Sequence, residues 1–565
     1  MSRHTLKIIA LGGSILLLLL SQYFTLGRIV DVGDGIAHYQ LARDAFQQPE
    51  LFFNTWGRPF YTLLMSFPAQ FGMGAVIFSN ILIATLTAIL LYQLTKDVGI
   101  SNGWLAPLLL ITSHSTWNTI FAGLTEPLFL LLTVYSTILI IQNKRNFAYI
   151  LFGTMVLTRP EAVITVPTLF TVDLIHNRPK LKELIQTIIW ALSIPLLYTA
   201  LGVFMYNKDW LYLIRSNSNH DAGDIYGFGN LNHFYIKRLE ITSNVIYLFS
   251  LIGILFAIYK RHWTLLITSL GGILIIVLHS LLWTFGLLGS AGLTRMLSTA
   301  LPFICLAAVY PLNFIRYKWI MQLCIGLILI SHSTNFIKQF KYLNTKDSKQ
   351  ELAIDFINQL RNKEQIQNNN WFVHWSFLRQ ELNIELNDKK YHHLWDLKTL
   401  KPSTNLSMND IIIHDNFTGN REGLTPIEWL KSDRRLRLIQ SAFDTQTGLQ
   451  LTAFKVLDLS DTLLTWNKGD ILNNNPRFKL NTDSTLTIDT RTLPYKLISQ
   501  NISKDQKIFV SLKFSSNAQA TIINNENVTN LNLPWQGDFS VEKGSFEIYI
   551  KGENEVHLHE ITIIK

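Results

Sequence analysis

The sequence predicts a polytopic α-helical membrane protein with about eleven transmembrane helices, followed by a water-exposed C-terminal region. The first observation behind this prediction is composition, because 48% of the 565 residues are hydrophobic and the mean hydropathy of +0.21 is too high for an ordinary soluble enzyme. The second is the placement of the apolar residues. Apolar stretches, several near the roughly 20 residues that cross a bilayer, follow one another from Leu6 to about Ile337, and none approaches that length from Lys338 onward.

The third observation is the distribution of charge. The formal net charge is +9, and all of the excess lies in residues 1–338, which hold 22 Lys and Arg against 13 Asp and Glu, whereas residues 339–565 hold 27 of each. The basic residues form short clusters between apolar stretches, and the positive-inside rule assigns such clusters to cytoplasmic loops. A nucleic-acid partner is therefore not expected. The clusters are Arg3/Lys7, Lys96, Lys144/Arg145, Arg178/Lys180/Lys182, Lys260/Arg261 and Arg316/Lys318.

The first apolar stretch, Leu6 to Leu26, is followed by no evident small-residue cleavage site and is expected to remain as an anchor. An odd number of spans from a cytoplasmic N-terminus places the C-terminal region outside, and we expect a bacterial inner membrane with that region in the periplasm. Later spans are expected at 73–95, 104–121, 125–142, 147–158, 161–176, 184–205, 243–259, 263–284, 296–312 and 319–337.

Acidic residues of the membrane region gather on one side. Of the 13 in residues 1–338, ten fall in segments expected outside, most of them close to span ends. Acids beside apolar spans are costly unless they are solvated, paired or bound to a metal. We interpret four of them as solvated loop residues: Asp44, Glu50, Asp209 and Glu240.

The stretch DVGDGIAHYQLARDAF directly follows the first span. It combines Asp31 and Asp34 with His38, Tyr39 and Arg43, a mixture that an inert connector does not need. A carboxylate at this level of the lipid headgroups can either deprotonate an acceptor hydroxyl or hold a divalent metal ion through oxygen. The next residues, FFNTWGRPFYTLLMSFP, are typical of an amphipathic helix that lies at the interface.

Two further outer turns carry ionisable groups. Glu126 lies in AGLTEPLFLLLT at the tip of a helical hairpin, where it either serves the site or only complements the dipole of the following helix. In LTRPEA, Arg159 and Glu161 flank Pro160 between two short spans. Arg159 can bind a phosphate with its planar fork or pair with Glu161, and the sequence leaves both open.

Arg295, in GSAGLTRMLSTALPF, is expected at the outer end of a late span, where it either serves the site or snorkels to headgroup phosphates. His279 and His332 lie within spans and are expected to be packing residues. Cys305 and Cys324 also lie within spans, so no structural disulfide is expected in the external region, which contains no Cys.

The order and the common side of these motifs resemble those of the GT-C superfamily of membrane glycosyltransferases, whose relatives include protein O-mannosyltransferases, the lipid A aminoarabinose transferase and the oligosaccharyltransferases. The resemblance covers about residues 5–337. It rests on GDGIAHYQLAR in the first external loop, on WGRPFYTLL, TEPLFLLL and LTRPEA, and on GLTRMLSTALP before a late span.

The resemblance implies a GT-C-type transmembrane catalytic domain in residues 1–338 that moves a sugar from a polyprenyl-phosphate donor to an extracytoplasmic glycan, lipid or protein, with inversion. It implies Asp34 as the first-loop catalytic acid and Glu126 as the acid of the second external loop. Many relatives have two adjacent acids where Gly35 follows Asp34 here, so Asp31 is a candidate substitute. A divalent cation, Mg or Mn, held by Asp34 and Glu126 is a further expectation. The implied donor-phosphate ligands are Arg58, Arg159 and Arg295.

The external region is expected to form two domains. Residues 339–460 alternate helix-like and strand-like segments, which predicts a small α/β domain. Residues 461–565 contain short strands separated by Asn, Gly and Asp, which predicts a β-sandwich-like domain.

Two rival functions follow from the same features. A transporter or a flippase of lipid-linked glycans also has many spans and basic inner loops, but its ionisable residues are expected near the bilayer midplane rather than at one face. A non-catalytic protein that binds glycans or assists assembly through its external region needs no Asp34.

Overall fold

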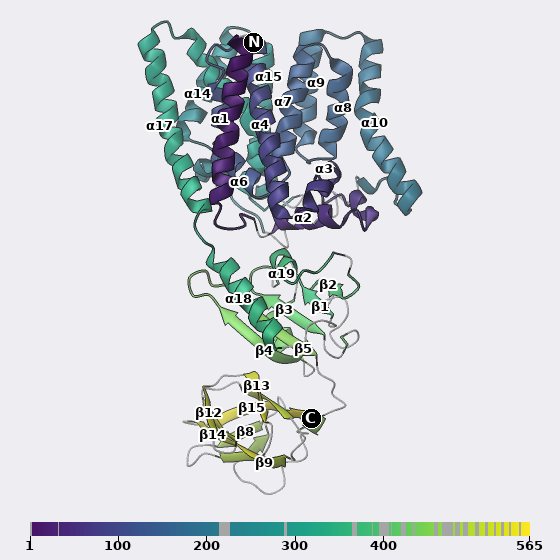
Figure 1. The fold of residues 1–565 in the computed structure, drawn as a ribbon, viewed down its shortest axis with the longest axis vertical. Helices are drawn as coiled ribbons and strands as arrows, with labels where there is room; N and C mark the ends of the chain where they lie inside the picture. The colour runs from purple at the N-terminus through teal and green to yellow at the C-terminus, as the bar shows by residue number, and fades with distance from the viewer. Residues whose placement is uncertain are drawn as a thin grey trace. The chain divides into compact units, whose positions relative to one another are not determined.

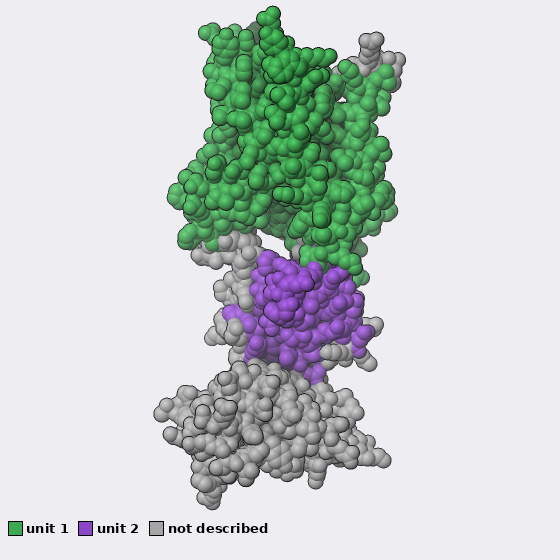
Figure 2. Space-filling model, turned by 90° about the vertical axis from the view of Figure 1, so that its left-hand side faces the viewer, with its two compact units in different colours: residues 1–347, 383–387 green, residues 348–382, 388–565 purple. Residues whose placement is uncertain are grey.

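The structure of the chain is a computed structural model. It describes residues 3–456 and, beyond residue 461, the backbones of the strands. The gaps within 3–456 are 32, 214–226, 288–290, 364–369, 387, 395–405, 408–409, 420–424 and 433–435. The chain forms two compact units, whose folds are drawn in Figure 1 and whose residues are coloured in Figure 2. Unit 1 comprises Met1–Asp347 and the short segment Asn383–Asn387. Unit 2 comprises Ser348–Leu382 and Asp388–Lys565.

Unit 1 is a helical bundle. Its main helices are α1 (Arg3–Thr25), α4 (Met73–Asp97), α7 (Glu126–Ile141), α8 (Arg145–Val156), α9 (Ala162–Asn177), α10 (Leu181–Tyr206), α14 (Asn244–Tyr259), α15 (Trp263–Thr284), α16 (Leu301–Val309) and α17 (Lys318–Leu343). Shorter elements are α2 (Asp34–Asp44), η1 (Pro49–Phe53), α3 (Pro59–Ala69), α5 (Leu105–Ile111), α6 (His114–Phe121), α13 (His233–Ile236), η2 (Arg238–Glu240), η3 (Thr294–Ala300) and η4 (Tyr310–Phe314).

Six helical stretches within the described residues are long and apolar enough to cross a membrane, or up to seven if the bent pair α6 and α7 is one span. The prediction of a multi-pass helical membrane protein is therefore confirmed. Each of the eleven expected spans coincides with a helix or a run of short helices, although the expected span 104–121 breaks into α5 and α6. Helices α6 and α7 meet at 118°, which makes residues 122–125 a tight turn between them.

We call the end of the bundle opposite the N-terminus, where α2 and α3 lie, the outer end, because the sequence predicts that it faces outward (Figure 1). Pro59 occupies the first turn of α3, where its missing N–H costs no hydrogen bond. Tyr39 of α2 and Tyr61 of α3 are buried in one apolar cluster with Phe129 of α7 and Phe152 of α8. This packing fixes the two short helices on the bundle and thereby positions the residues that they carry.

The opposite end of the bundle contains a buried ion pair that joins α8, α9 and α10. Asp173, which has no exposed surface, accepts hydrogen bonds from Arg145 Nε at 2.9 Å and Nη2 at 2.8 Å, from the Tyr149 hydroxyl at 2.8 Å and from Asn177 Nδ2 at 2.7 Å. Arg145 Nη1 also lies 3.5 Å from Glu183. Every oxygen of Asp173 is thus satisfied, as a buried carboxylate requires.

Asp44 is not the solvated loop residue that the sequence suggested, because its side chain is only 3% exposed. It accepts a 2.6 Å hydrogen bond from Arg43 Nε and a 2.8 Å hydrogen bond from the backbone N–H of Leu386. The segment Asn383–Asn387 therefore belongs to unit 1, although unit 2 contributes the chain on both sides of it. Leu386 packs against a small apolar cluster of Leu41, Ala45, Leu51 and Phe52.

Within the described residues, unit 2 begins with a five-stranded sheet and three helices. Its five-stranded sheet has the order β2-β1-β3-β5-β4, with β2, β1 and β3 parallel and the other pairs antiparallel. Helix α18 (Ser348–Lys363) packs on β4. The strands are β1 (Trp371–Val373), β2 (Tyr391–His392), β3 (Ile411–Asp415), β4 (Leu436–Phe443) and β5 (Gln450–Val456), and the other helices are α19 (Ser376–Glu381) and α21 (Ile427–Ser432).

The remaining strands form two antiparallel sheets, which is the strand content that the expected β-sandwich needs. One sheet has the order β13-β10-β15-β8-β7 with β6 beside β15, and the other has the order β12-β11-β14-β9. The strands are β6 (Thr462–Thr465), β7 (Phe478–Leu480), β8 (Leu486–Asp489), β9 (Tyr495–Ile502), β10 (Ile508–Phe514), β11 (Ala518–Asn524), β12 (Asn527–Asn532), β13 (Gln536–Val541), β14 (Gly544–Gly552) and β15 (Glu555–Ile564).

Candidate functional site

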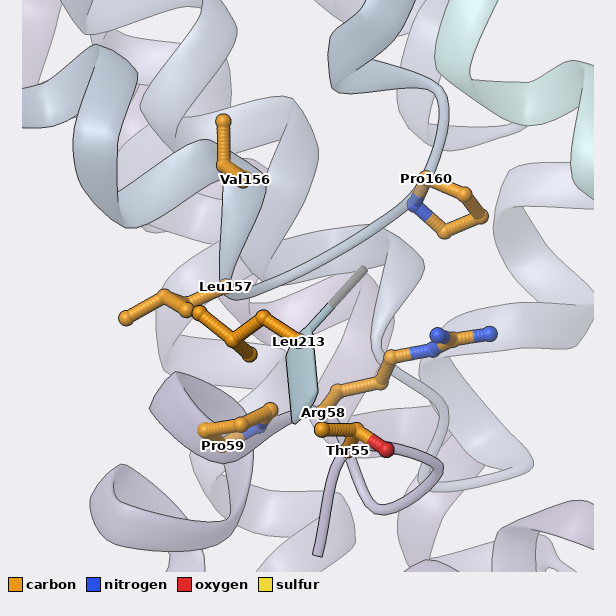
Figure 3. A pocket seen from close by; sticks show the side chains of 7 residues that line it. All are labelled: Thr55, Arg58, Pro59, Val156, Leu157, Pro160 and Leu213. Atoms are coloured by element: carbon orange, nitrogen blue, oxygen red, sulfur yellow. The ribbon is translucent and has the colours of Figure 1, made fainter. Parts of the chain in front are cut away.

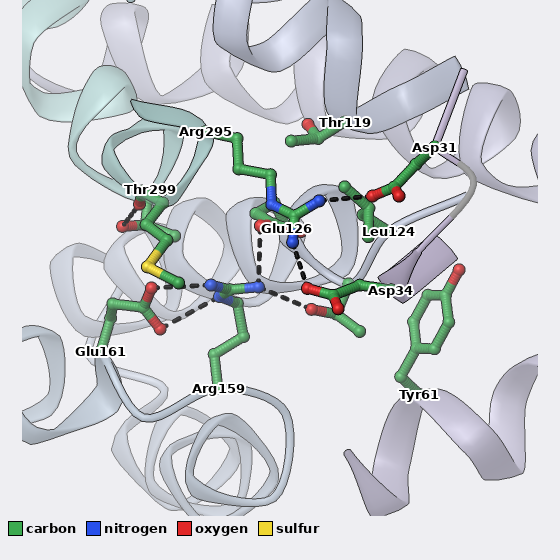
Figure 4. A network of polar contacts seen from close by, with 12 residues as sticks. Asp31, Asp34, Tyr61, Thr119, Leu124, Glu126, Arg159, Glu161, Arg295 and Thr299 are labelled. Atoms are coloured by element: carbon green, nitrogen blue, oxygen red, sulfur yellow. Dashed lines mark hydrogen bonds and ion pairs between the residues drawn. The ribbon is translucent and has the colours of Figure 1, made fainter. Parts of the chain in front are cut away.

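Arg295 joins the two acids of the first outer loop. One guanidinium nitrogen, Nη1, is paired with Asp31 and the other, Nη2, with Asp34, the first residue of α2 (Figure 4). The Arg295 side chain is 16% exposed, whereas the Asp34 side chain keeps 45% of its accessible surface. Arg295 belongs to η3, so a late helix of the bundle and the first outer loop meet at these three side chains.

Gly35 explains how α2 comes so close to the turn after α6. A Cβ atom at position 35 would collide with the carbonyl oxygen of Ala122, so only glycine permits this approach. The sequence has this glycine where many GT-C relatives have a second acid. Asp31 meets Arg295 instead, which places two carboxylates beside one cation.

Arg159 is held by a second group of acids. Its Nη1 lies 2.9 Å from Glu126 Oε1 and donates to the Thr125 hydroxyl at 2.7 Å, while Nε and Nη2 donate to the two oxygens of Glu161 at 3.0 and 2.8 Å (Figure 4). Arg159, Glu126 and Glu161 are 7%, 1% and 2% exposed. Of the two interpretations left open by the sequence, pairing of Arg159 with Glu161 is the one present in the structure, and Glu126 joins it.

His279, in the C-terminal part of α15, is also part of this group. Its Nε2 lies 3.5 Å from Glu161 Oε1, and its side chain is 7% exposed. The sequence interpretation treated His279 only as a packing residue. Its polarity within an apolar span was the available signal, because ionisable groups inside spans usually serve a site.

Arg58 differs from the other two arginines because its guanidinium forms no ion pair or side-chain hydrogen bond with any residue that the structure describes. Its backbone is left-handed, with φ 60°, which turns the chain into α3. Arg58 interacts electrostatically with Asp34, Glu126, Arg159 and Glu161, so its charge lies near both acidic groups.

A small pocket lies along the Arg58 side chain (Figure 3). Its volume is about 30 Å³, room for no more than one or two water molecules. A sugar phosphate therefore needs an opening of this region. Its other lining residues are mostly apolar: Thr55, Pro59, Val156, Leu157, Pro160 and Leu213.

The electrostatic surroundings keep Asp34 ionised. Burial alone would raise the pKa of Asp34, but the Arg295 guanidinium, with a smaller contribution from Arg58, holds that pKa below its ordinary value of 3.8. Burial lowers the pKa of His38 to about 3, so His38 is neutral at physiological pH. Burial and the neighbouring Arg159 likewise lower the pKa of Arg58 from its ordinary value of 12.5.

The remaining residues singled out in the first loop have other neighbours. The His38 ring stacks on Trp56, with ring centroids 4.9 Å apart and planes 20° apart. Tyr39 is 5% exposed in the apolar core, and Arg43 pairs with Asp44. The structure therefore brings Asp31, Asp34, Glu126, Glu161 and the three arginines to one region, and directs Tyr39 and Arg43 away from it.

The donor set does not fit a metal ion in this arrangement. Within the described ranges, no three His, Cys, Asp or Glu side chains lie close enough to hold one. The two expected ligands, Asp34 and Glu126, are paired with Arg295 and Arg159 respectively. We therefore derive no catalytic step through a metal ion.

No protein-family model and no curated protein matches the chain. Among solved structures, ArnT from Cupriavidus metallidurans in the apo state matches with a TM-score of 0.53 and 10% identity over 80% of this chain and 98% of that one. Arabinofuranosyltransferase AftD from Mycobacteria matches at a TM-score of 0.48 and 10% identity over 100% of this chain and 59% of that one. Arabinosyltransferase EmbB from Mycobacterium smegmatis matches at 0.34 and 9% identity, over 98% of this chain and 64% of that one.

This chain thus spans about three fifths of the length of the AftD and EmbB chains. The likeness to ArnT covers nearly all of that protein, which is a GT-C membrane glycosyltransferase. The resemblance noted in the sequence is therefore confirmed at the level of the fold: the chain shares the fold of ArnT.

Proposed function

We propose that this protein is an integral-membrane glycosyltransferase that moves a sugar from a polyprenyl-phosphate donor to a glycan, lipid or protein acceptor on the outer side of the membrane, in a multi-pass inner-membrane location. The observation that carries the proposal is the convergence of a partly exposed carboxylate, Asp34, with two cations, Arg295 and Arg58, at the outer ends of apolar helices. Ionisable groups gathered at one face fit a transferase better than a transporter.

Asp34 is proposed as the general base. It is the most exposed carboxylate of the site, since Glu126 and Glu161 are almost fully buried, and it stays ionised because its pKa is lowered. Asp34 accepts the proton of the acceptor hydroxyl while the acceptor oxygen bonds to the anomeric carbon and the bond from that carbon to the phosphate oxygen breaks. Attack on the side opposite to the phosphate inverts the configuration.

Arg58 and Arg295 are proposed to hold the donor phosphate, whose negative charge grows as it leaves. Arg58 is available directly, because no described carboxylate pairs with it. Arg295 must exchange partners, because Asp31 and Asp34 occupy its two terminal nitrogens. The donor phosphate would thus release Asp34 from Arg295 at the moment when Asp34 has to accept a proton.

Arg159 is proposed to support the site rather than to bind donor. Its guanidinium is occupied by Glu126, Glu161 and Thr125, and breaking this cluster would leave two buried carboxylates without a cation. Glu126 keeps one buried oxygen, Oε2, without a hydrogen bond from the described residues. That oxygen is available to a hydroxyl of a bound sugar.

The proposal is tested by sugar transfer in membranes. A panel of labelled polyprenyl-phosphate monosaccharides is incubated with membranes that contain the wild type or equal amounts of Asp34→Asn. The proposal is supported if the wild type transfers label to acceptors and the variant transfers it at least 10²-fold more slowly. One general base contributes about 10²- to 10⁴-fold to the rate of such a reaction. Equal transfer by both proteins, or none with either while a known transferase works in parallel, contradicts it.

A further inference from the structure

Trp56 is an unusual residue at the edge of the candidate site. Its side chain is 39% exposed, and it lies in the turn between η1 and α3, two positions before Arg58 in the chain. One face of the indole is covered by the His38 ring. Because the centroid separation is only 4.9 Å, nothing fits between the two rings, and the exposed area belongs to the rest of the indole.

The turn that carries Trp56 is firmly held. The side-chain oxygen of Asn54 accepts a 3.0 Å hydrogen bond from the Gly57 N–H, and the Thr62 hydroxyl donates to the Gly57 carbonyl at 2.8 Å. A Cβ atom at Gly57 would lie 2.9 Å from the Leu41 side chain, so this glycine lets the turn approach α2. An exposed aromatic ring on such a turn is already in place before any ligand binds.

His38 fixes the indole from behind and relates it to the proposed base. His38 is 6% exposed and its ring lies edge-on to Tyr61, at a centroid distance of 5.8 Å, while the Tyr61 hydroxyl donates to the Gly123 carbonyl at 2.6 Å. His38 also follows Asp34 by four residues on α2, which places both side chains on one face of that helix. Trp56 is therefore one end of a stack of rings that contains His38, a residue one helical turn from Asp34.

An alternative role for an exposed Trp near a span end is anchoring among lipid headgroups. A Trp residue that only anchors the protein among headgroups does not need a polar side chain packed against its ring. Here the indole rests on an imidazole that is buried, neutral and without a hydrogen bond at Nδ1 from the described residues, which is a costly arrangement. The cost is explained if the buried His38 ring serves to hold the Trp56 ring in a fixed orientation.

We propose that the exposed face of Trp56 is a stacking platform for a sugar ring of the acceptor, which makes the acceptor a glycan rather than a protein or a simple lipid. The C–H bonds on one face of a pyranose or furanose carry partial positive charge and pack on the electron-rich face of an indole. An exposed platform against the helix that carries Asp34 fits an acceptor that arrives from outside, whereas the donor arrives through the membrane. This inference rests on the proposed function, because it names the acceptor class of the same site.

Binding is tested independently of transfer by saturation-transfer difference NMR on the full chain in lipid nanodiscs. The probes are trisaccharides of mannose, galactose, glucose and arabinose. We expect saturation transfer to the C–H protons of one ring of at least one probe with the wild type, reduced about fivefold to tenfold in Trp56→Ala and less in Trp56→Phe, which keeps an aromatic ring. Trp104→Ala is the matched control, because Trp104 is also 39% exposed but precedes α5 at the other end of the bundle. Its signal should equal that of the wild type.

Transfer kinetics provide the second measurement. In Trp56→Ala the KM for the glycan acceptor should rise about fivefold to tenfold, the size of one aromatic contact, with the KM for the donor unchanged. Three outcomes overturn the inference. The wild type and Trp56→Ala give equal NMR signals, no probe gives a signal with the wild type, or Trp56→Ala and Trp104→Ala lose the same share of the signal. If Trp56→Ala is recovered in low yield, Trp56→Leu, which keeps apolar bulk but has no aromatic ring, carries the comparison. Absence of transfer by the wild type contradicts the proposed function, whereas the NMR result still decides the stacking site.

Discussion

Asp34 and Arg295 lie 261 residues apart in the chain, yet their side chains form an ion pair at the outer end of the bundle. Asp31 occupies the other terminal nitrogen of the same guanidinium. A phosphate that binds Arg295 must compete with both carboxylates, so the acids and the phosphate are thermodynamically linked.

Removal of either carboxylate charge should tighten phosphate binding, because it weakens the competitor for Arg295. We expect Asp31→Asn and Asp34→Asn each to bind polyprenyl phosphate about tenfold more tightly than the wild type, which corresponds to about 1.4 kcal/mol. The measurement is a titration of the protein in nanodiscs with polyprenyl phosphate. Glu50→Gln is the control, since Glu50 is an exposed acid of the same outer segment. Unchanged affinities in both Asp variants would show that Arg295 does not bind phosphate.

The pH dependence of transfer should follow the ionisation of Asp34. Its pKa is lowered from 3.8, so the base is ionised above that pH and activity is lost only as the pH falls through the lowered pKa. In Arg295→Gln the effect of burial is no longer offset, so the pKa of Asp34 rises and the acid limb of the pH profile moves to higher pH. Rates are measured in proteoliposomes from pH 8 down to pH 4, a range in which the wild type should keep its activity and Arg295→Gln should begin to lose it. An acid limb that stays in place would mean that another group is the base.

Replacement of Arg58 should weaken donor binding without unfolding the protein. Arg58 has no described carboxylate partner, so Arg58→Gln breaks no ion pair and leaves no buried acid without its cation. We expect the KM for the donor to rise at least tenfold, since a charged hydrogen bond contributes about 1.5–3 kcal/mol, with an unchanged melting temperature. Arg238→Gln, a change of a half-buried arginine that hydrogen-bonds to Asn244 and lies outside the proposed site, serves as the control. A normal donor KM in Arg58→Gln would rule out its proposed role.

The buried pair at the inner end should matter for stability and not for chemistry. Asp173→Asn leaves Arg145 with only the Glu183 contact, and we expect a loss of about 3 kcal/mol in unfolding free energy. Glu183→Gln should cost much less, because the Glu183 side chain is 53% exposed. Thermal unfolding in detergent, with transfer rates of the folded fraction, separates the two effects. Equal stability of Asp173→Asn and the wild type would contradict the assignment.

Much of this architecture could be predicted from the sequence because it depends on local composition. Apolar runs and basic clusters are local, and they placed Asp34, Glu126, Arg159 and Arg295 on one face. The partners could not be predicted, since Arg159 pairs with Glu126 from another hairpin as well as with the adjacent Glu161.

Burial of single residues was equally difficult to predict. Asp44 follows Arg43 in a polar helix and resembles a solvated acid, but a distant segment covers it. Trp56 gave no signal, because interfacial Trp residues are common in membrane proteins and its stacking on His38 depends on a turn that only the fold brings beside α2.

The contact between Asp44 and Leu386 also affects the order in which the protein is assembled. The two residues are 342 positions apart, so a ribosome that adds 5–20 residues per second makes Leu386 roughly 20 to 70 seconds after Asp44. During that interval the carboxylate lacks its backbone partner and the small apolar cluster around Leu41 lacks its cover. Helix α2 can therefore reach its final environment only after the first part of the external region has been synthesised. The membrane unit is not one continuous stretch of sequence, and a chain that stops at Asp347 would lack one of its pieces.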